Sequence, residues 1–338
     1  MRELLNGHNK TKFIIIIAAV VALLAAIYCV LNYVETYGQV KDVSGDGFVK
    51  SVPDITYEGE TYSYKSRLKN IMILGIDNSE SEYIKGDTEY HGGRSDMIFL
   101  LSIDYNNRII TPIQINREAM VEFAPTDQNG IKLGSDYEQI CIAYAYGDGG
   151  KISCNNTKEA LSTLLYGTPI TDCFSLKIDG VAPLNDAVGG VAVTVEDDFS
   201  NIDPSLTQGA TVTLTGEQAT KFVRARMNVG GGTNEERMSR HRTYVKAFME
   251  TLRPKLEEDR TFVSTLLDTV SKYSYSSMSA ATIASIINNT SDFEVKDIIT
   301  PTGNVIQKEE GENWAELELD DAQLKSIIVN TFYEKTEK

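Results

Sequence analysis

Histidine, cysteine and tryptophan are scarce in this sequence, whose 338 residues include three histidines, four cysteines and one tryptophan. No C-x-x-C pair and no H-E-x-x-H motif occurs, although both are ligand spacings typical of zinc sites. Positive charge is also in short supply, because 32 basic residues face 48 acidic ones and the formal net charge is −16. These absences argue against a zinc centre and against a nucleic-acid partner, which would need a basic domain.

Charge is absent from one long segment, FIIIIAAVVALLAAIYCVLNYV. About 20 apolar residues are needed for a helix to cross a bilayer, so this segment predicts a transmembrane helix. A cleaved signal peptide is the alternative, although its apolar run is usually shorter. Basic residues precede the segment and acidic residues dominate the next twelve, which favours a cytoplasmic N-terminus. We therefore expect a single-pass protein of the cell membrane with a cytoplasmic tail (1–12), a membrane helix (13–34), an extracellular stalk (35–66) and an extracellular folded domain (67–338).

Three cysteines, Cys141, Cys154 and Cys173, fall in the part expected outside the membrane. Disulfides are permitted there, and three cysteines allow at most one bridge. The sequence does not select a pairing, and three buried thiols remain an equally open alternative.

Short apolar runs at 70–77, 97–104 and 108–115 predict three β-strands. Nearly every position in them is apolar, which is typical of strands covered on both faces in a layered α/β domain. A helical pattern follows at 155–167, with Asn155 as its expected cap.

Two further helices are expected in the second half of the chain. One begins at Thr215, which has Gln218 at the spacing of a capping box. The other begins near Asn234 and ends near Leu252, with Met249 in its predicted core stripe.

A basic island lies at residues 221–242, where six lysines and arginines accompany two glutamates. Charge alone leaves two readings open, a solvated helix face with ion pairs or an anion site. Arg237, Arg240 and His241 are spaced to share one face within the first two turns of a helix, where cations are locally unfavourable unless an anion binds. A glycine run at 230–232 lets two more arginines reach the same place, Arg224 and Arg226. Guanidinium groups match phosphate oxygens, so the pattern favours a pyrophosphate site.

Two aspartates stand at strand ends near a further arginine. Asp77 ends one predicted strand, and Asp96 lies at the entrance to the next, two residues after Arg94. Such carboxylates suit a Mg²⁺ ion that is held by few protein ligands and by substrate phosphate oxygens. An aspartate at a strand end is also a common turn residue or cap.

The motifs NIMILGID, GRSDMIFLLSID, INREAM, LTGEQATKFVRAR and ERMSRH occur in this order. Together they resemble the LytR-CpsA-Psr (LCP) family of bacterial cell-envelope proteins, from about Leu68 to the C-terminus. The resemblance implies a three-layer α/β/α sandwich with a central mixed β-sheet, preceded by one N-terminal transmembrane helix. It also implies a phosphotransferase that moves an anionic glycopolymer, such as teichoic acid or capsule, from a polyprenyl-pyrophosphate carrier to peptidoglycan.

Site residues follow from the same resemblance. Asp77 and Asp96 match the aspartates that hold Mg²⁺ in the family, and five arginines match its pyrophosphate contacts: Arg94, Arg117, Arg224, Arg226 and Arg237. With Arg240 and His241 from the helix pattern, these arginines form the predicted pyrophosphate set. Asp96, Arg117 and Glu118 are the expected catalytic residues, with Asp96 or Glu118 as the base for the incoming hydroxyl.

Two departures from the family pattern are notable. The family's Pro-Arg-Asp is Asn116-Arg117-Glu118 here, and its Gln is replaced by His241, which we expect to become positive at mildly acid pH. Two other functions stay open beside transfer: a non-catalytic protein that binds lipid-linked polymer, and a polyprenyl-pyrophosphate hydrolase.

Overall fold

The structure is a computed structural model that describes residues 48–49, 52–77, 92–307 and 315–336. The predicted membrane helix, the start of the predicted stalk and most of the loop between Asp77 and Asp96 lie outside these residues. None of the described helices is long and apolar enough to cross a membrane. The chain divides into two units, Met1–Ser51 and Val52–Lys338, and the second is described below.

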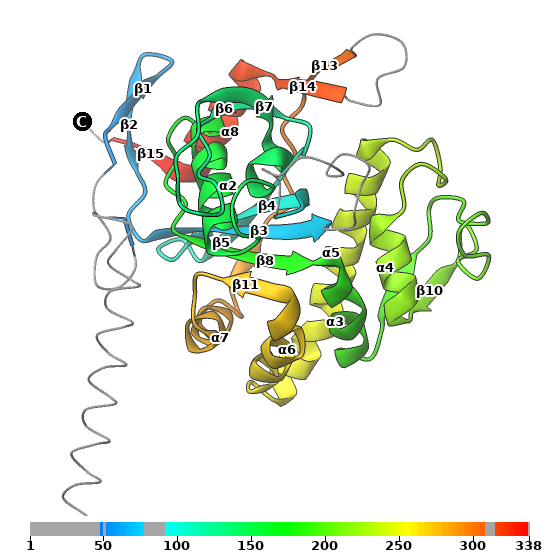
Figure 1. Cartoon of the computed structure of the whole chain (residues 1–338). Coiled ribbons are helices and arrows are strands. Elements are labelled where there is room, and N and C mark those ends of the chain that lie inside the picture. The colour runs from blue at the N-terminus through cyan, green and yellow to red at the C-terminus, as the bar shows by residue number, and fades with distance from the viewer. Residues whose placement is uncertain (1–47, 50–51, 78–91, 308–314, 337–338) are drawn as a thin grey trace, which may run out of the picture. The chain divides into compact units, whose positions relative to one another are not determined.

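Strands and α-helices of 7 to 25 residues alternate through this second unit (Figure 1). The strands are β1 (Ile55–Tyr57), β2 (Glu60–Tyr64), β3 (Leu68–Asp77), β4 (Arg94–Asp104), β5 (Ile109–Ile115), β6 (Met120–Phe123), β7 (Asp136–Gln139), β8 (Asp172–Lys177), β9 (Val191–Thr194), β10 (Thr211–Leu214), β11 (Ser274–Ser276), β12 (Glu294–Val295), β13 (Gly303–Gln307), β14 (Ala315–Leu319) and β15 (Tyr333–Lys335). The α-helices are α2 (Lys151–Leu164), α3 (Val181–Ala187), α4 (Gly216–Arg224), α5 (Asn234–Glu258), α6 (Phe262–Val270), α7 (Ala280–Asn289) and α8 (Asp321–Phe332).

A six-stranded sheet in the order β11-β8-β3-β4-β5-β12 forms the centre of the unit. β3, β4 and β5 are antiparallel neighbours, whereas β8 runs parallel to β3 and β12 parallel to β5. The sheet is therefore mixed, and the three strands predicted from apolar runs are its central ones.

Helices cover both faces of this sheet (Figure 1). Because successive residues of a strand point to opposite faces, Met72 of β3 packs in one apolar cluster with Leu161 of α2 and Ile328 of α8. Its neighbour Ile71 packs in another cluster, with Ile286 of α7. The two clusters confirm the layered α/β arrangement that the largely apolar runs predicted.

A further apolar core joins the β9–β10 hairpin to α3, α4, α5 and α6. Val191 and Val193 of β9 are buried there against Phe222 of α4 and Leu252 of α5. This packing holds α4 and α5 beside the ends of β3 and β4 (Figure 1), which is where the predicted arginines and aspartates meet.

Helix ends are set by local hydrogen bonds. Thr215 and Gln218 form the predicted capping box of α4, and Thr233 with Glu236 forms a second one that starts α5. Gly230 and Gly232 have positive φ angles of 56° and 73°, which lets the chain turn from α4 into α5 as expected.

Three details of the predicted helices are wrong. α2 begins at Lys151 instead of Asn155, because the side chain of Asp148 accepts a 3.0 Å hydrogen bond from the main-chain N–H of Ile152. α5 continues to Glu258, beyond the predicted end at residue 252. Met249 is exposed, because its side of α5 faces solvent.

Candidate active site

A bulge in β4 distinguishes Asp96 from its neighbours. Gly75 of β3 pairs with Met97, and the next residue, Ile76, pairs with Ser95, so Asp96 has no partner in the β3–β4 register. An extra residue of this kind bends the strand and redirects a side chain. The bulge thus accounts for a carboxylate that leaves the sheet and meets side chains from other elements.

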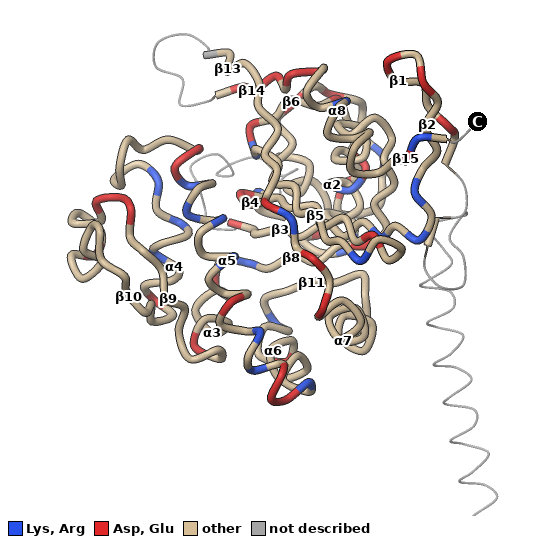
Figure 2. The backbone as a smooth tube through the Cα atoms, turned by 180° about the vertical axis from the view of Figure 1, so that it is seen from behind, with Lys and Arg blue, Asp and Glu red and all other residues tan. Residues whose placement is uncertain are grey.

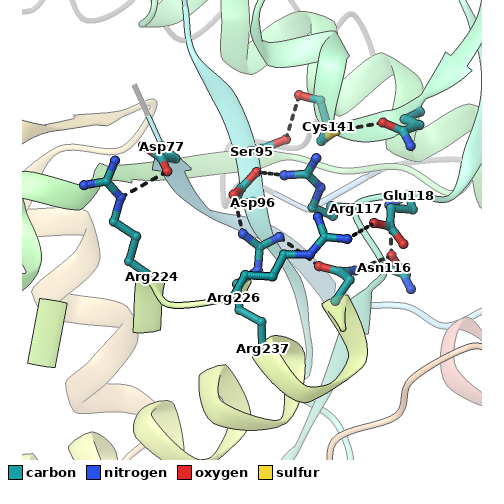
Figure 3. Close-up of polar contacts among 12 residues, drawn as sticks. Asp77, Ser95, Asp96, Asn116, Arg117, Glu118, Cys141, Arg224, Arg226 and Arg237 are labelled. Carbon is teal, nitrogen blue, oxygen red and sulfur yellow. Dashed lines mark hydrogen bonds and ion pairs between the residues drawn. The ribbon is translucent and has the colours of Figure 1, made fainter. Parts of the chain in front are cut away.

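The carboxylate of Asp96 lies between two guanidinium groups (Figure 3). Oδ1 accepts a hydrogen bond from Nη1 of Arg117, and Oδ2 accepts one from Nη1 of Arg237 at 2.6 Å. The side chains of Asp96, Arg117 and Arg237 are 12%, 5% and 6% exposed. Burial alone would raise the pKa of Asp96, but Arg117, Arg237 and Arg94 outweigh it and lower that pKa. Asp96 is therefore ionised at neutral pH.

A second ion pair lies at the adjacent strand end. Asp77 and Arg94 face each other in the β3–β4 register. Oδ2 of Asp77 is 3.4 Å from Nε of Arg224, the last residue of α4. The arginine is 48% exposed, so this pair sits at the accessible side of the cluster.

The pKa of Glu118 is shifted in the opposite direction to that of Asp96. Its Oε1 is 3.3 Å from Nη2 of Arg226, and the glutamate is buried. Burial raises the pKa of Glu118, and the neighbouring Arg226 and Arg117 do not reverse that effect. Of the two acids expected to be the base, Glu118 is therefore the one with the stronger affinity for a proton.

Arg240 is buried apart from these pairs, although the helix pattern predicted that it would share their anion site. Its guanidinium group forms an ion pair with Asp197 and donates hydrogen bonds to the main-chain oxygens of Phe222 and Ala225. These contacts tie α5 to the end of α4. This arrangement does not favour the predicted phosphate contact of Arg240, because its Nε, Nη1 and Nη2 atoms already donate to protein oxygens. The contact stays a prediction.

His241 is neutral in the structure. Its Nε2 lies 2.9 Å from the main-chain oxygen of Val223 and so carries the proton, since a carbonyl can only accept. Burial and the nearby Arg237 lower the pKa of His241 to about 4. The expectation that His241 becomes positive at mildly acid pH is therefore wrong, because a charged imidazole would lose its solvation beside an arginine.

The predicted site carries more positive than negative charge. Five arginines (Arg94, Arg117, Arg224, Arg226 and Arg237) accompany three carboxylates (Asp77, Asp96 and Glu118), which leaves a formal charge of +2. Among the described residues, the Nε atoms of Arg117, Arg226 and Arg237 are buried without a hydrogen-bond partner. Buried donors of this kind are costly unless a ligand accepts from them. Figure 2 shows the basic positions of α4 and α5 lying together.

No cluster of three or more histidine, cysteine, aspartate or glutamate side chains suited to a metal ion occurs in the described part of the chain. Asp77 and Asp96 nevertheless come from adjacent strands, and Asp96 is held ionised. This pair fits an ion that takes few protein ligands and completes its shell with phosphate and water oxygens, as Mg²⁺ does.

Two polar residues of the site were missed by sequence reasoning, Asn116 and Asn234. The side-chain oxygen of each accepts a hydrogen bond from a residue of the site. Asn116 accepts from the main-chain N–H of Glu118, and Asn234 accepts from Nη2 of Arg237. The available signal was an amide directly before Arg117, where the family pattern has proline.

Comparison with known proteins agrees with the family resemblance of the sequence motifs. A family model described as the LytR_cpsA_psr family matches residues 41–329. The polyisoprenyl-teichoic acid–peptidoglycan teichoic acid transferase TagU of Halalkalibacterium halodurans is 29% identical over 181 residues, which is 54% of this chain and 52% of that protein. Biofilm regulatory protein A of Streptococcus mutans is 24% identical over 266 residues, or 77% and 57% of the two chains. The chain spans about half the length of the curated relatives it matches.

Solved structures share the fold. The crystal structure of TagV from B. subtilis superposes with a TM-score of 0.59 at 21% identity, covering 78% of this chain and 95% of that one. TagT bound to LI-WTA superposes with a TM-score of 0.58 at 18% identity, covering 86% and 98%. At these identities the likeness establishes the mixed α/β fold.

Proposed function

The chain belongs to the LytR-CpsA-Psr family, and on that premise we propose that it transfers an anionic glycopolymer from a polyprenyl-pyrophosphate carrier to peptidoglycan. Relatives named as teichoic acid transferases support this reaction class. A fold relative described as bound to LI-WTA supports a lipid-linked glycopolymer as the ligand. The predicted membrane helix at residues 13–34 would keep the enzyme at the outer face of the cytoplasmic membrane, beside its lipid carrier.

One observation carries the proposal: an arginine cluster with net positive charge in which the Nε–H donors of Arg117, Arg226 and Arg237 are buried and unpartnered. Buried donors without an acceptor are costly, so the cluster is best explained by an anion that accepts from them. A pyrophosphate supplies several negative oxygens in a compact group. The unpartnered Nε–H groups of Arg117, Arg226 and Arg237 can donate to such oxygens.

The reaction needs a nucleophile and a leaving group. The oxygen of a peptidoglycan sugar hydroxyl attacks the phosphorus that bears the polymer, the phosphoanhydride bond breaks, and polyprenyl phosphate leaves. Charge on the transferred and departing phosphates is stabilised by the arginines, as in other phosphoryl transfers. Asp96 contributes by holding Arg117 and Arg237 in place.

The hydroxyl proton passes to Glu118 in this proposal. Its raised pKa makes Glu118 the better proton acceptor, whereas the lowered pKa of Asp96 makes that carboxylate a weak base. We propose that Asp77 and Asp96 also hold Mg²⁺, which would neutralise phosphate charge when bound.

The experiment that tests the function incubates the purified full-length chain with Mg²⁺, a polyprenyl-pyrophosphate-linked oligosaccharide and peptidoglycan oligomers. Mass spectrometry of the products separates the three possible activities. A phosphodiester-linked oligosaccharide–peptidoglycan product supports transfer. Free phosphorylated oligosaccharide would instead indicate hydrolysis, and unchanged donor that co-purifies with the protein would indicate a binding function.

A further inference from the structure

Asn116 directly follows β5, the strand that leads into the site, and its side-chain oxygen accepts two hydrogen bonds. One comes from the main-chain N–H of Glu118 at 2.9 Å, and the other comes from Nδ2 of Asn234 at 2.9 Å. The main-chain oxygen of Asn116 also accepts from the N–H of Ala119 at 3.0 Å. The turn that presents Arg117 and Glu118 is thus tied to the start of α5.

Asn234 extends the chain of contacts on the other side. It is the first residue of α5 and is 5% exposed. Its side-chain oxygen accepts a 2.8 Å hydrogen bond from Nη2 of Arg237, whose Nη1 is bound to Asp96. The two asparagine amides therefore connect the main chain of Glu118 with the Arg237–Asp96 ion pair; Figure 3 shows that ion pair beside Asn116.

We propose that Asn116 and Asn234 are positioning residues, which fix the Glu118 carboxylate relative to the Arg237–Asp96 pair. The consequence for turnover rests on the proposed function of the site. An amide that accepts from a guanidinium group limits how that side chain can rotate, and hydrogen bonds to charged groups are stronger than those between neutral ones. Transfer needs the base and the phosphate-binding arginine in one fixed geometry.

A purely structural role for the Asn234 side chain is a weaker explanation. The start of α5 is already closed by the capping box of Thr233 and Glu236, so the side chain of Asn234 is not needed as a cap. Its Oδ1 instead accepts from Arg237, and its Nδ2 donates to Asn116 at 2.9 Å and makes a longer contact with Sδ of Met238 at 3.6 Å.

The test uses the full-length chain with Asn116→Ala, Asn234→Ala and the double variant, and Asn289→Ala at an exposed position of α7 as a matched control. We expect each single variant to lower kcat by about 10- to 100-fold with little change in KM. The double variant should be no worse than the poorer single one, because both act through one connection. Asn116→Asp should retain most activity, since its carboxylate oxygen can still accept both hydrogen bonds.

A readout without substrate separates this inference from the proposed function. NMR signals of the Arg237 guanidinium, assigned with Arg237→Lys, should show restricted rotation in the wild type and in Asn289→Ala, and faster rotation in Asn234→Ala. A wild type without transferase activity would contradict the proposed function, while the NMR comparison would still decide the positioning role. Unchanged Arg237 rotation in Asn234→Ala would overturn the inference, as would unchanged kcat in both alanine variants of an active enzyme.

Discussion

Nη1 of Arg237 lies 2.6 Å from Oδ2 of Asp96, although the two residues are 141 positions apart in the sequence. The contact joins α5 to the bulge of β4 and brings the basic island of the sequence onto the aspartate of GRSD. Arg117 reaches the other oxygen of the same carboxylate. A buried acid held between two arginines, inside a cluster of net positive charge, is the feature from which the predictions below follow.

Asp96→Asn should impair both stability and turnover. Removing the charge leaves two buried guanidinium groups without their counter-ion, and breaking a buried ion pair costs about 3–5 kcal/mol. We expect the free energy of unfolding in urea to fall by that order and turnover to fall at least about 100-fold. Asp268→Asn, at an exposed position of α6, is the control. Wild-type stability in Asp96→Asn would show that the ion pairs are not maintained in solution.

Glu118→Gln should remove the acidic limb of the pH–rate profile. Glu118 accepts a proton only when ionised, so the wild-type rate should decline as pH falls through a pKa above its ordinary value of 4.5. We expect kcat to drop by about 10²- to 10⁴-fold in the variant, with the remaining rate independent of pH in that range. The comparison is Glu159→Gln on the exposed side of α2. An acidic limb that survives in Glu118→Gln would assign the base to another group.

His241→Gln should make stability less sensitive to acid. The pKa of His241 is about 4 in the folded chain, against the ordinary histidine value of 6.5. Between pH 4 and pH 6.5 the unfolded chain therefore binds more protons than the folded one. Stability contributed by the neutral ring is therefore present above pH 6.5 and is lost as pH falls towards 4, by roughly 3 kcal/mol in total. Urea unfolding at pH 7 and pH 4.5 should show a smaller loss in the variant. Equal losses in both proteins would mean that His241 is not buried as a neutral group.

Asp77→Asn should weaken the response to magnesium. If Asp77 and Asp96 hold the ion together, loss of one charged ligand should raise the Mg²⁺ concentration needed for half-maximal turnover by at least about 10-fold. Turnover measured over a Mg²⁺ titration after chelator treatment gives this value. A half-maximal concentration equal to that of the wild type would place the metal elsewhere.

Much of the fold could be predicted because its signals are local. The central strands β3, β4 and β5 are built on largely apolar runs, and the capping box at Thr215 marks a helix start whatever packs around it. Local signals also mislead where a loop intervenes: Asp148 accepts a hydrogen bond from the N–H of Ile152, and α2 begins four residues before the expected Asn155.

The site could be predicted by residue type but not by arrangement. Arginines and aspartates were visible in the sequence, whereas the bulge at Asp96 depends on how β3 and β4 align. The same holds for Arg240 and His241, which share a helix with Arg237 but are turned into contacts with α4. Spacing along a helix gives only the directions of its side chains relative to one another, so tertiary packing decides which neighbour each side chain meets.

The most direct test of the arginine cluster is a calorimetric titration of the full-length chain with inorganic pyrophosphate, with and without Mg²⁺. The wild type and Arg253→Ala, which changes an exposed arginine of the same helix, should bind with equal affinity. Arg237→Ala should bind at least about 10-fold more weakly, because a charge-assisted contact to phosphate is lost. Equal affinity of Arg237→Ala and the wild type, or no binding by either, would contradict a pyrophosphate site built on Asp96, Arg117 and Arg237.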